Sequence, residues 1–182
     1  MASTLADRLR PLRRARQVRE FTTEPVDAAA LDAIADVARW SGSSRNTQPW
    51  RFIVVTDAGI LGRLAAIGLP QTRSLQTATA AIAIVLPADE GHEIGNAYDE
   101  GRAAERLLIA AGLLELAAGV AWILPRVRAE VGSVLGLPAD RFVRTIVAVG
   151  HATPAAQRPK SAPGAARLPR SETVFSERWP QD

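Results

Sequence analysis

The sequence predicts a fold of the α/β or α+β class, arranged as a single domain over residues 1–182. Short apolar runs of strand length alternate along the chain with longer segments whose apolar residues recur at helical spacing. A chain of 182 residues is long enough to bury one substantial core. Residues 151–169 are rich in proline and poor in large apolar side chains, so the tail at 151–182 is expected either to be disordered or to wrap around another surface.

Five helices are expected from spacing and capping residues. Asp27 and Asp57 are good N-caps for the second and third helices. Gly136 and the following proline stop the fifth. The expected ranges are 4–14, 28–40, 58–67, 97–118 and 126–135.

Four apolar runs predict strands, at residues 52–56, 80–86, 119–124 and 145–149. The second run is apolar throughout, as in a strand buried on both faces. Residues 16–21 are expected to be extended, 71–77 to form a loop or short turn, and 89–96 a polar loop. Residues 173–175 can add one more short strand, and Trp179 suggests that the tail docks onto protein.

Composition narrows the functional classes. Hydrophobic residues make up 47% of the chain and charged residues 23%, which is ordinary for a soluble globular protein. There is no cysteine, which fits a reducing compartment, and we expect a cytoplasmic protein without a secretion signal. With only His92 and His151, a histidine-rich metal site or a Ser-His-Asp triad has little material.

Six arginines fall between Arg8 and Arg19, although the net charge is only +3. They form either a solvated basic face or an anion site, with phosphate as the expected anion. Nucleic-acid binding is not expected, because the charge is not interleaved with aromatic residues and no RNP-like or zinc-finger motif is present. Residues 107–124 are apolar enough to resemble a membrane span, but Glu115 in their middle favours a buried helix followed by a strand.

The densest motif is the segment at residues 43–52, which reads SSRNTQPWRF between a helix and a strand. Ser43, Ser44 and Asn46 supply hydrogen-bond donors and acceptors suited to a flat polar ligand. Pro49 and Trp50 can equally be a turn and a core residue. Two further motifs are RQVREF at 16–21 and RLP at 167–169.

Together, in this order, the three motifs resemble those of the FMN-dependent nitroreductase family. The family reads near R-R-S-x-R-x-F, P-S-x-x-N-x-Q-P-W and, close to the C-terminus, R-x-P. This chain departs from the pattern at Ala15, Gln17, Gly42 and Ala165. The resemblance covers roughly residues 16–179.

The resemblance implies an α+β, nitroreductase-like fold with a central mixed sheet flanked by helices. It also implies a homodimer with a domain-swapped C-terminal arm, packed through the long helix at 97–118, with FMN at the subunit interface. Flavin contacts are implied for Arg16, Gln17, Arg19, Ser43, Ser44, Asn46, Gln71 and Arg167.

The implied roles differ along the chain. Arg16 and Arg19 would hold a phosphate and a pyrimidine carbonyl by forked donation, and Arg167 would clamp the phosphate. The turn at 43–50 would reach the flavin of the other subunit. Gln71 would pair with the pyrimidine, as an asparagine does in relatives. Lys160 can replace the lysine that relatives carry at position 165 only if the tail folds back.

The implied activity is an NAD(P)H-dependent flavin oxidoreductase that passes hydride through flavin N5 to a nitroaromatic, quinone or activated-alkene acceptor by a ping-pong mechanism. No side-chain acid or base is required, so no catalytic residue is named. The alternatives are a non-catalytic flavin-binding protein that sequesters or senses flavin, a dimeric interaction domain without flavin, and an enzyme that takes hydride from a deazaflavin. Neither a metal nor a nucleic-acid or membrane partner is expected.

Overall fold

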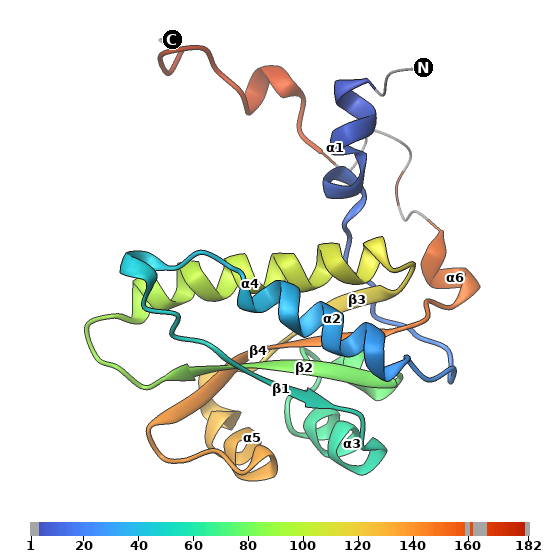
Figure 1. Ribbon diagram of the computed structural model, residues 1–182, viewed down its shortest axis with the longest axis vertical. Helices are drawn as coiled ribbons and strands as arrows, with labels where there is room; N and C mark the ends of the chain where they lie inside the picture. Colours follow the sequence, from blue (N-terminus) through green and yellow to red (C-terminus); the bar gives the residue numbers. More distant parts are fainter. Residues whose placement is uncertain (1–3, 159–160, 162–166, 181–182) are drawn as a thin grey trace.

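A computed structural model of the chain describes residues 4–158, 161 and 167–180. Its centre is a four-stranded sheet in the order β1-β2-β4-β3, and all neighbouring strands run antiparallel (Figure 1). The strands are β1 (Arg51–Val55), β2 (Ala80–Pro87), β3 (Ala117–Trp122) and β4 (Arg141–Gly150). The α+β class is therefore confirmed.

The resemblance implies a mixed sheet, and in the described residues parallel pairing is confined to one isolated bridge, between Gln17 and Ala118. The segment that runs parallel to β3 is the short stretch after the N-terminal helix, and it forms a single bridge instead of a strand. The four strands themselves pair only antiparallel.

Helices cover both faces of the sheet (Figure 1). On one face lie α2 (Ala28–Arg39) and α4 (Glu93–Leu113), and on the other α3 (Ala58–Ile67) and α5 (Arg128–Leu135). Strand β2 is buried on both sides, as its uninterrupted apolar run predicts. Ile82 and Ile84 face α2 and α4, while Ala81 and Ala83 face α3 and α5.

Two predicted caps are confirmed. Asp27 Oδ2 accepts from the backbone N–H of Ala30 at 3.1 Å, and Asp57 Oδ1 accepts from that of Ile60 at 2.8 Å. Each carboxylate satisfies a donor that the first turn of its helix leaves unpaired. The helix α1 (Leu5–Arg14) begins with a capping box made by Thr4 and Asp7.

The long helix differs from its expected range of 97–118. It begins four residues earlier, because Glu93 supplies a carboxylate to the first turn and stabilises an N-terminus within the expected loop. It ends at Leu113, where Glu115 adopts a left-handed φ of 61° and the Leu116 N–H bonds back to the Ala111 carbonyl. Strand β3 therefore starts at Ala117, inside the predicted helix.

Short helices fill the connections. They are η1 (Ser44–Asn46), η2 (Arg73–Gln76), η3 (Pro125–Val127), α6 (Pro154–Gln157) and η4 (Arg170–Glu172). The strand expected at 173–175 is wrong: the chain there leaves η4 through a turn, because no sheet edge lies beside it.

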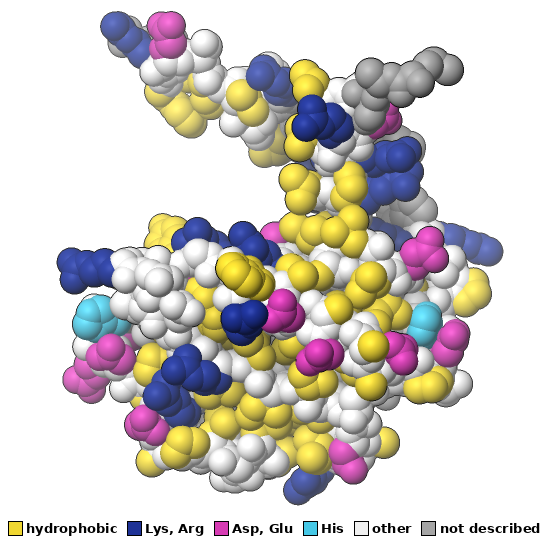
Figure 2. All heavy atoms as spheres, viewed as in Figure 1, with side chains coloured by type: hydrophobic (Ala, Val, Ile, Leu, Met, Phe, Trp, Pro, Cys, Tyr) yellow, Lys and Arg dark blue, Asp and Glu magenta, His cyan; other side chains and the backbone are white. Residues whose placement is uncertain are grey.

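The two ends of the described chain lie apart from the sheet (Figure 1). No residue of α1 is buried, and Leu5, Leu9 and Leu12 are all exposed. Trp179 is 78% exposed and lies edge-on against Phe175, so among the described tail residues this side chain does not dock onto the body of its own subunit. Figure 2 shows hydrophobic side chains beside arginines on both ends.

In the described part of the chain, no helix is both long enough and apolar enough to span a membrane. The apolar run at 107–124 is divided instead between the end of α4 and the whole of β3. Both pieces contribute to the core, as Leu107 on α4 and Ala121 on β3 illustrate.

Candidate functional site

The predicted extended segment at 16–21 lies along β3, one of the two edge strands of the sheet. The Val18 N–H donates to the Ala118 carbonyl at 2.8 Å, and Phe21 forms an isolated bridge with Ala152. Val18 and Phe21 are buried, which anchors the segment at both ends.

The close contact between this segment and β3 requires a glycine. A Cβ on Gly119 would lie 1.9 Å from the Val18 carbonyl oxygen, so no larger residue fits there without moving the backbone. Since Val18 points into the core, its neighbours Gln17 and Arg19 are left exposed at the surface.

A cavity of about 440 Å³ lies where this segment meets β3 and the loop before η2. This volume is within the usual range of small-molecule sites. Three predicted site residues, from two distant parts of the sequence, meet in it. It is lined by Gln17, Arg19, Pro70, Gln71, Arg73, Val120 and Trp122.

The lining has a consistent chemical character. The carboxamides of Gln17 and Gln71 can each donate and accept, and the guanidinium groups of Arg19 and Arg73 can donate to an anion or a carbonyl. No carboxylate is among the lining residues that the structure describes. The cavity therefore suits a ligand that is polar at its edges and carries negative charge.

Four lining residues are not among the contacts predicted from the sequence, namely Pro70, Arg73, Val120 and Trp122. The last two lie two residues apart on β3, so they share one face of the strand. Trp122 is 45% exposed, which places an indole ring at the cavity for stacking on a flat ligand. The signal in the sequence was an aromatic residue within an otherwise small and aliphatic strand.

Arg16 points elsewhere. Its Nη2 atom donates to the carbonyls of Ala156 at 2.9 Å and Gln157 at 2.6 Å, and Nη1 to that of Arg158 at 3.5 Å. The guanidinium thus satisfies carbonyls at the end of α6, where a cation is favoured. Its predicted role towards a phosphate would require these bonds to be exchanged.

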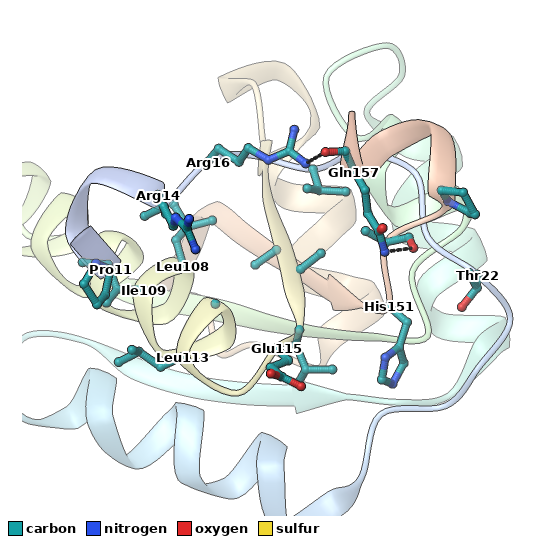
Figure 3. A pocket seen from close by; sticks show the side chains of 18 of the residues that line it. Pro11, Arg14, Arg16, Thr22, Leu108, Ile109, Leu113, Glu115, His151 and Gln157 are labelled. Atoms are coloured by element: carbon teal, nitrogen blue, oxygen red, sulfur yellow. Dashed lines mark hydrogen bonds between the residues drawn. The ribbon is translucent and has the colours of Figure 1, made fainter. Parts of the chain in front are cut away.

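A larger cavity of about 710 Å³ lies beside Arg16, between α1, the end of α4 and the residues around α6 (Figure 3). Of the predicted site residues, only Arg16 lines it. Its charged lining is of both signs, since Glu24 and Glu115 accompany the arginines. One wall is α1, which has no buried residue. We therefore place the candidate site in the smaller cavity, where the predicted donors converge.

The turn at 43–50 is ordered by contacts among its own residues. Ser43 Oγ accepts from the Gln48 N–H at 2.9 Å, and Gln48 Nε2 donates to Asn46 Oδ1 at 3.2 Å. Trp50 is 3% exposed and belongs to the core, which confirms its interpretation as a core residue.

The same turn is strained. Arg45, Asn46 and Gln48 have φ values of 49°, 55° and 48°, in the left-handed region that residues other than glycine rarely adopt. Each such residue costs about 1–3 kcal/mol, and strain of this kind concentrates at ligand-binding sites. The turn therefore carries the backbone signature of a functional segment.

The turn and the cavity are separate within one subunit. Ser43, Ser44 and Asn46 line neither cavity, and the turn lies near the start of α4, at one end of that helix (Figure 1). Arg167 is exposed on the tail and also lines neither cavity. Ala165 and Lys160 lie outside the described residues.

A buried ion pair ties α4 to the sheet. Arg144 Nε on β4 donates to Glu100 Oε2 at 2.6 Å; the Glu100 side chain is almost fully buried, and that of Arg144 is 15% exposed. Arg128 stacks on Phe142 with its Cζ atom 5.0 Å from the ring centroid. Burial lowers the pKa of Arg128, and the positive charge of Arg144 lowers it further, although Glu100 opposes both. Within the described ranges, no cluster of three or more potential metal ligands occurs.

A family model described as the nitroreductase family matches residues 12–84, which include the first two motifs and Gln71. The oxygen-insensitive NADPH nitroreductase of Helicobacter acinonychis is 36% identical over 93 residues, 47% of this chain and 43% of that protein. A protein of the same description from Helicobacter pylori is 36% identical over 77 residues, 38% of this chain and 36% of that protein. The matched region thus spans less than half of these relatives.

Solved structures extend the likeness over the whole fold. A putative nitroreductase from Desulfovibrio desulfuricans, crystallised in complex with FMN, superposes with a TM-score of 0.79 at 25% identity, covering 98% of this chain and 100% of that one. NfrA2 of B. megaterium gives 0.80 at 25% identity, covering 96% and 75%. The nitroreductase-like fold and the resemblance to that family are confirmed.

Proposed function

We propose that this chain, which has the nitroreductase-like fold, is an FMN-dependent oxidoreductase that takes hydride from NAD(P)H and passes it to a small organic acceptor. The observation that carries the proposal is the cavity beside β3, where Gln17, Arg19 and Gln71 meet. Similarity to NADPH nitroreductases and to an FMN complex supports the identity of the cofactor.

The residues of the cavity fit the flavin part by part. Gln17 and Gln71 offer the donor and acceptor pairs that the edge of the pyrimidine ring requires. Arg19 and Arg73 provide positive charge for a carbonyl or the phosphate, and Trp122 offers an aromatic surface. Bound there, FMN would supply the hydride chemistry through N5, and the protein would bind and orient it.

The proposal includes a homodimer. The polar turn at 43–50 lies away from the cavity of its own subunit, so it would contribute Ser43, Ser44 and Asn46 to the cavity of the partner. Support comes from the apolar surface that one subunit leaves exposed, including Leu9 on α1, Tyr98 on α4 and Trp179 on the tail. The arm at 151–182 would then carry Arg167 to a phosphate across the interface.

For the reaction we propose a ping-pong cycle with a nitroaromatic, quinone or activated alkene as acceptor. The cavity wall need only orient the two substrates in turn, and no side-chain acid or base is required. Steady-state rates with NADPH and a nitroaromatic should give parallel double-reciprocal lines. Intersecting lines would rule out the ping-pong order.

Two observations favour a second candidate, a flavin-binding protein without turnover. The guanidinium of Arg16 is bonded to three carbonyls, and the position of the family's serine is Gln17. Both features differ from the phosphate contacts that the resemblance implies. Such a protein would sequester or sense FMN.

The visible absorption spectrum of the purified protein, before and after addition of FMN, tests both candidates. Bound-flavin bands bleached by NADPH support the oxidoreductase. Bands that neither NADH nor NADPH can bleach support the sequestering protein or a deazaflavin donor. A protein that rejects FMN contradicts both candidates.

A matched pair of variants tests the location of the site. Arg19→Ala should weaken FMN binding by about 1.5–3 kcal/mol, the contribution of a hydrogen bond to a charged group. Arg16→Ala, three residues away, should weaken it less, because its guanidinium already serves α6. An unchanged dissociation constant for Arg19→Ala would remove the cavity beside β3 from consideration.

A further inference from the structure

The turn at 43–50 has an external anchor whose role the sequence did not suggest. The backbone N–H of Ser44 donates to Asp99 Oδ2 at 3.0 Å. Asp99 is 3% exposed and belongs to α4, so the turn is bonded to a different element 55 residues away in sequence.

Asp99 has a second partner that also touches the turn's base. Arg102, one helical turn further along α4, places Nη1 3.5 Å from Asp99 Oδ1. Its guanidinium packs so closely against Gly42 that a Cβ there would lie 2.3 Å from Nη2. The start of the turn is therefore held by Asp99 through a hydrogen bond to Ser44 and by Arg102 through contact with Gly42.

Helix α4, which carries Asp99 and Arg102, is itself bonded to the sheet. The residue after Asp99 is Glu100, whose carboxylate is paired with Arg144 on β4. Two adjacent buried carboxylates thus bind in different directions, one to the sheet and one to the turn. Through α4, the turn is therefore connected to the central sheet.

The strained backbone of the turn calls for contacts that hold it in place. Left-handed residues at positions 45, 46 and 48 persist only where surrounding contacts over-determine the backbone. The hydrogen bonds among Ser43, Asn46 and Gln48 close the turn on itself but do not fix its orientation. The bond to Asp99 links the first half of the turn to α4, while Arg51 at the start of β1 donates to the Gln48 carbonyl at 3.0 Å near its end.

We propose that Asp99 is a positioning residue for flavin binding: it holds the Ser44 backbone so that Ser43, Ser44 and Asn46 present their polar groups in the arrangement that the cofactor needs. The effect on flavin binding rests on the proposed function, whereas the bond between Asp99 and Ser44 does not depend on it. In this role Asp99 would act through the turn, without contacting the cofactor itself.

The test compares Asp99→Ala, Asp99→Asn and the control Glu105→Ala, an exposed carboxylate on the same helix. Two quantities are measured on each full-length protein: the dissociation constant for FMN, and amide hydrogen exchange in the apoprotein. Asp99→Ala should raise the dissociation constant by roughly tenfold or more, as expected for loss of a bond to a charged group. Asp99→Asn keeps an oxygen that can accept from Ser44 and should recover most of the affinity, while the control should match the wild type.

Exchange separates a positioning role from a general loss of stability. In Asp99→Ala, the Ser44 amide and its neighbours at 43–48 should exchange faster, while β2 and β4 keep their protection. Faster exchange throughout the molecule, or unchanged exchange at Ser44, would overturn the proposal. If the wild type binds no FMN, the proposed function fails and exchange at Ser44 still decides whether Asp99 holds the turn. If exchange changes locally but FMN affinity does not, the positioning role is overturned while the proposed function stands.

Discussion

The body of the molecule and its two ends use apolar residues in opposite ways. In the body, Ile34, Leu107 and Ile146 are fully buried between the sheet and its helices. At the ends, Leu9 of α1 is 54% exposed and Trp179 of the tail 78% exposed. Both ends nonetheless have defined local structure, a capped helix and a 3-10 turn.

This contrast is what the proposed dimer would explain, since the two ends would then meet the surface of a second subunit. An isolated ten-residue helix is marginal in water, so α1 gains little by forming alone. A capped helix with three exposed leucines becomes favourable when a partner covers that face. The exposed face of α1 is therefore a candidate surface of the proposed dimer.

The buried ion pair of the body should matter most for stability. Glu100→Ala leaves the guanidinium of Arg144 buried without its partner, which should lower the free energy of unfolding by about 3–5 kcal/mol. Urea denaturation measures it, with the exposed Glu105→Ala on the same helix as the control. A loss below 1 kcal/mol would show that the pair is not what holds α4 to β4.

One substitution made in both regions tests the comparison directly. Leu107→Ala in α4 should cost about 2–5 kcal/mol at any protein concentration, because it opens a cavity in the core. Leu9→Ala in α1 should leave the unfolding of the subunit nearly unchanged but weaken association, seen by sedimentation at decreasing concentration. If Leu9→Ala changes neither, the exposed face of α1 is not an interface.

The segment at 16–21, which joins α1 to the body, should have an intermediate effect on the free energy of unfolding when its contact with β3 is disturbed. Gly119→Ala forces the Val18 carbonyl away from β3 and should cost about 1–3 kcal/mol, with loss of FMN affinity as Gln17 and Arg19 move. Gly62→Ala is the matched control: nothing lies near its added methyl group, and alanine is the better helix former, so stability should rise by about 0.5–1 kcal/mol. Equal stability of the two variants would contradict the close packing of the segment on β3.

The smallest effect is expected at an exposed pair on the surface of α2. A hydrogen bond from Arg39 lowers the pKa of Asp36, as does that residue's charge, and Trp40 donates as well. Because the folded pKa is lowered, the stabilisation is present above the unfolded value and is lost as pH falls through the folded one. Asp36→Asn should therefore lower the urea midpoint slightly at pH 7 and less at acidic pH. A difference independent of pH would show that the charge is not its source.

The sequence was sufficient where local chemistry decides the structure. The caps at Asp27 and Asp57, the doubly buried run at β2 and the core role of Trp50 each follow from residue type and spacing. It was insufficient where tertiary contacts decide, as at the end of α4, where Glu115 adopts a left-handed φ.

The candidate site divides in the same way. Its motif residues could be named from the sequence, because their chemistry is distinctive. The contribution of Trp122 could not, since it depends on which strand lies at the sheet edge. Nor could the bond of Asp99 to Ser44, which joins residues 55 positions apart. The assignment of the eight proposed flavin contacts stays a prediction.

Strand β2 has a consequence for how the protein must be handled. Its run from Ala80 to Leu86 carries no charge, proline or glycine, and it combines β-branched and aliphatic residues. Segments of this composition stack into intermolecular sheets when they are exposed. In the folded chain β2 has a neighbour along each edge and helices over each face, and the acidic pair Asp89 and Glu90 follows it closely as a gatekeeper. Variants that destabilise the core are therefore expected to aggregate into inclusion bodies instead of remaining unfolded in solution.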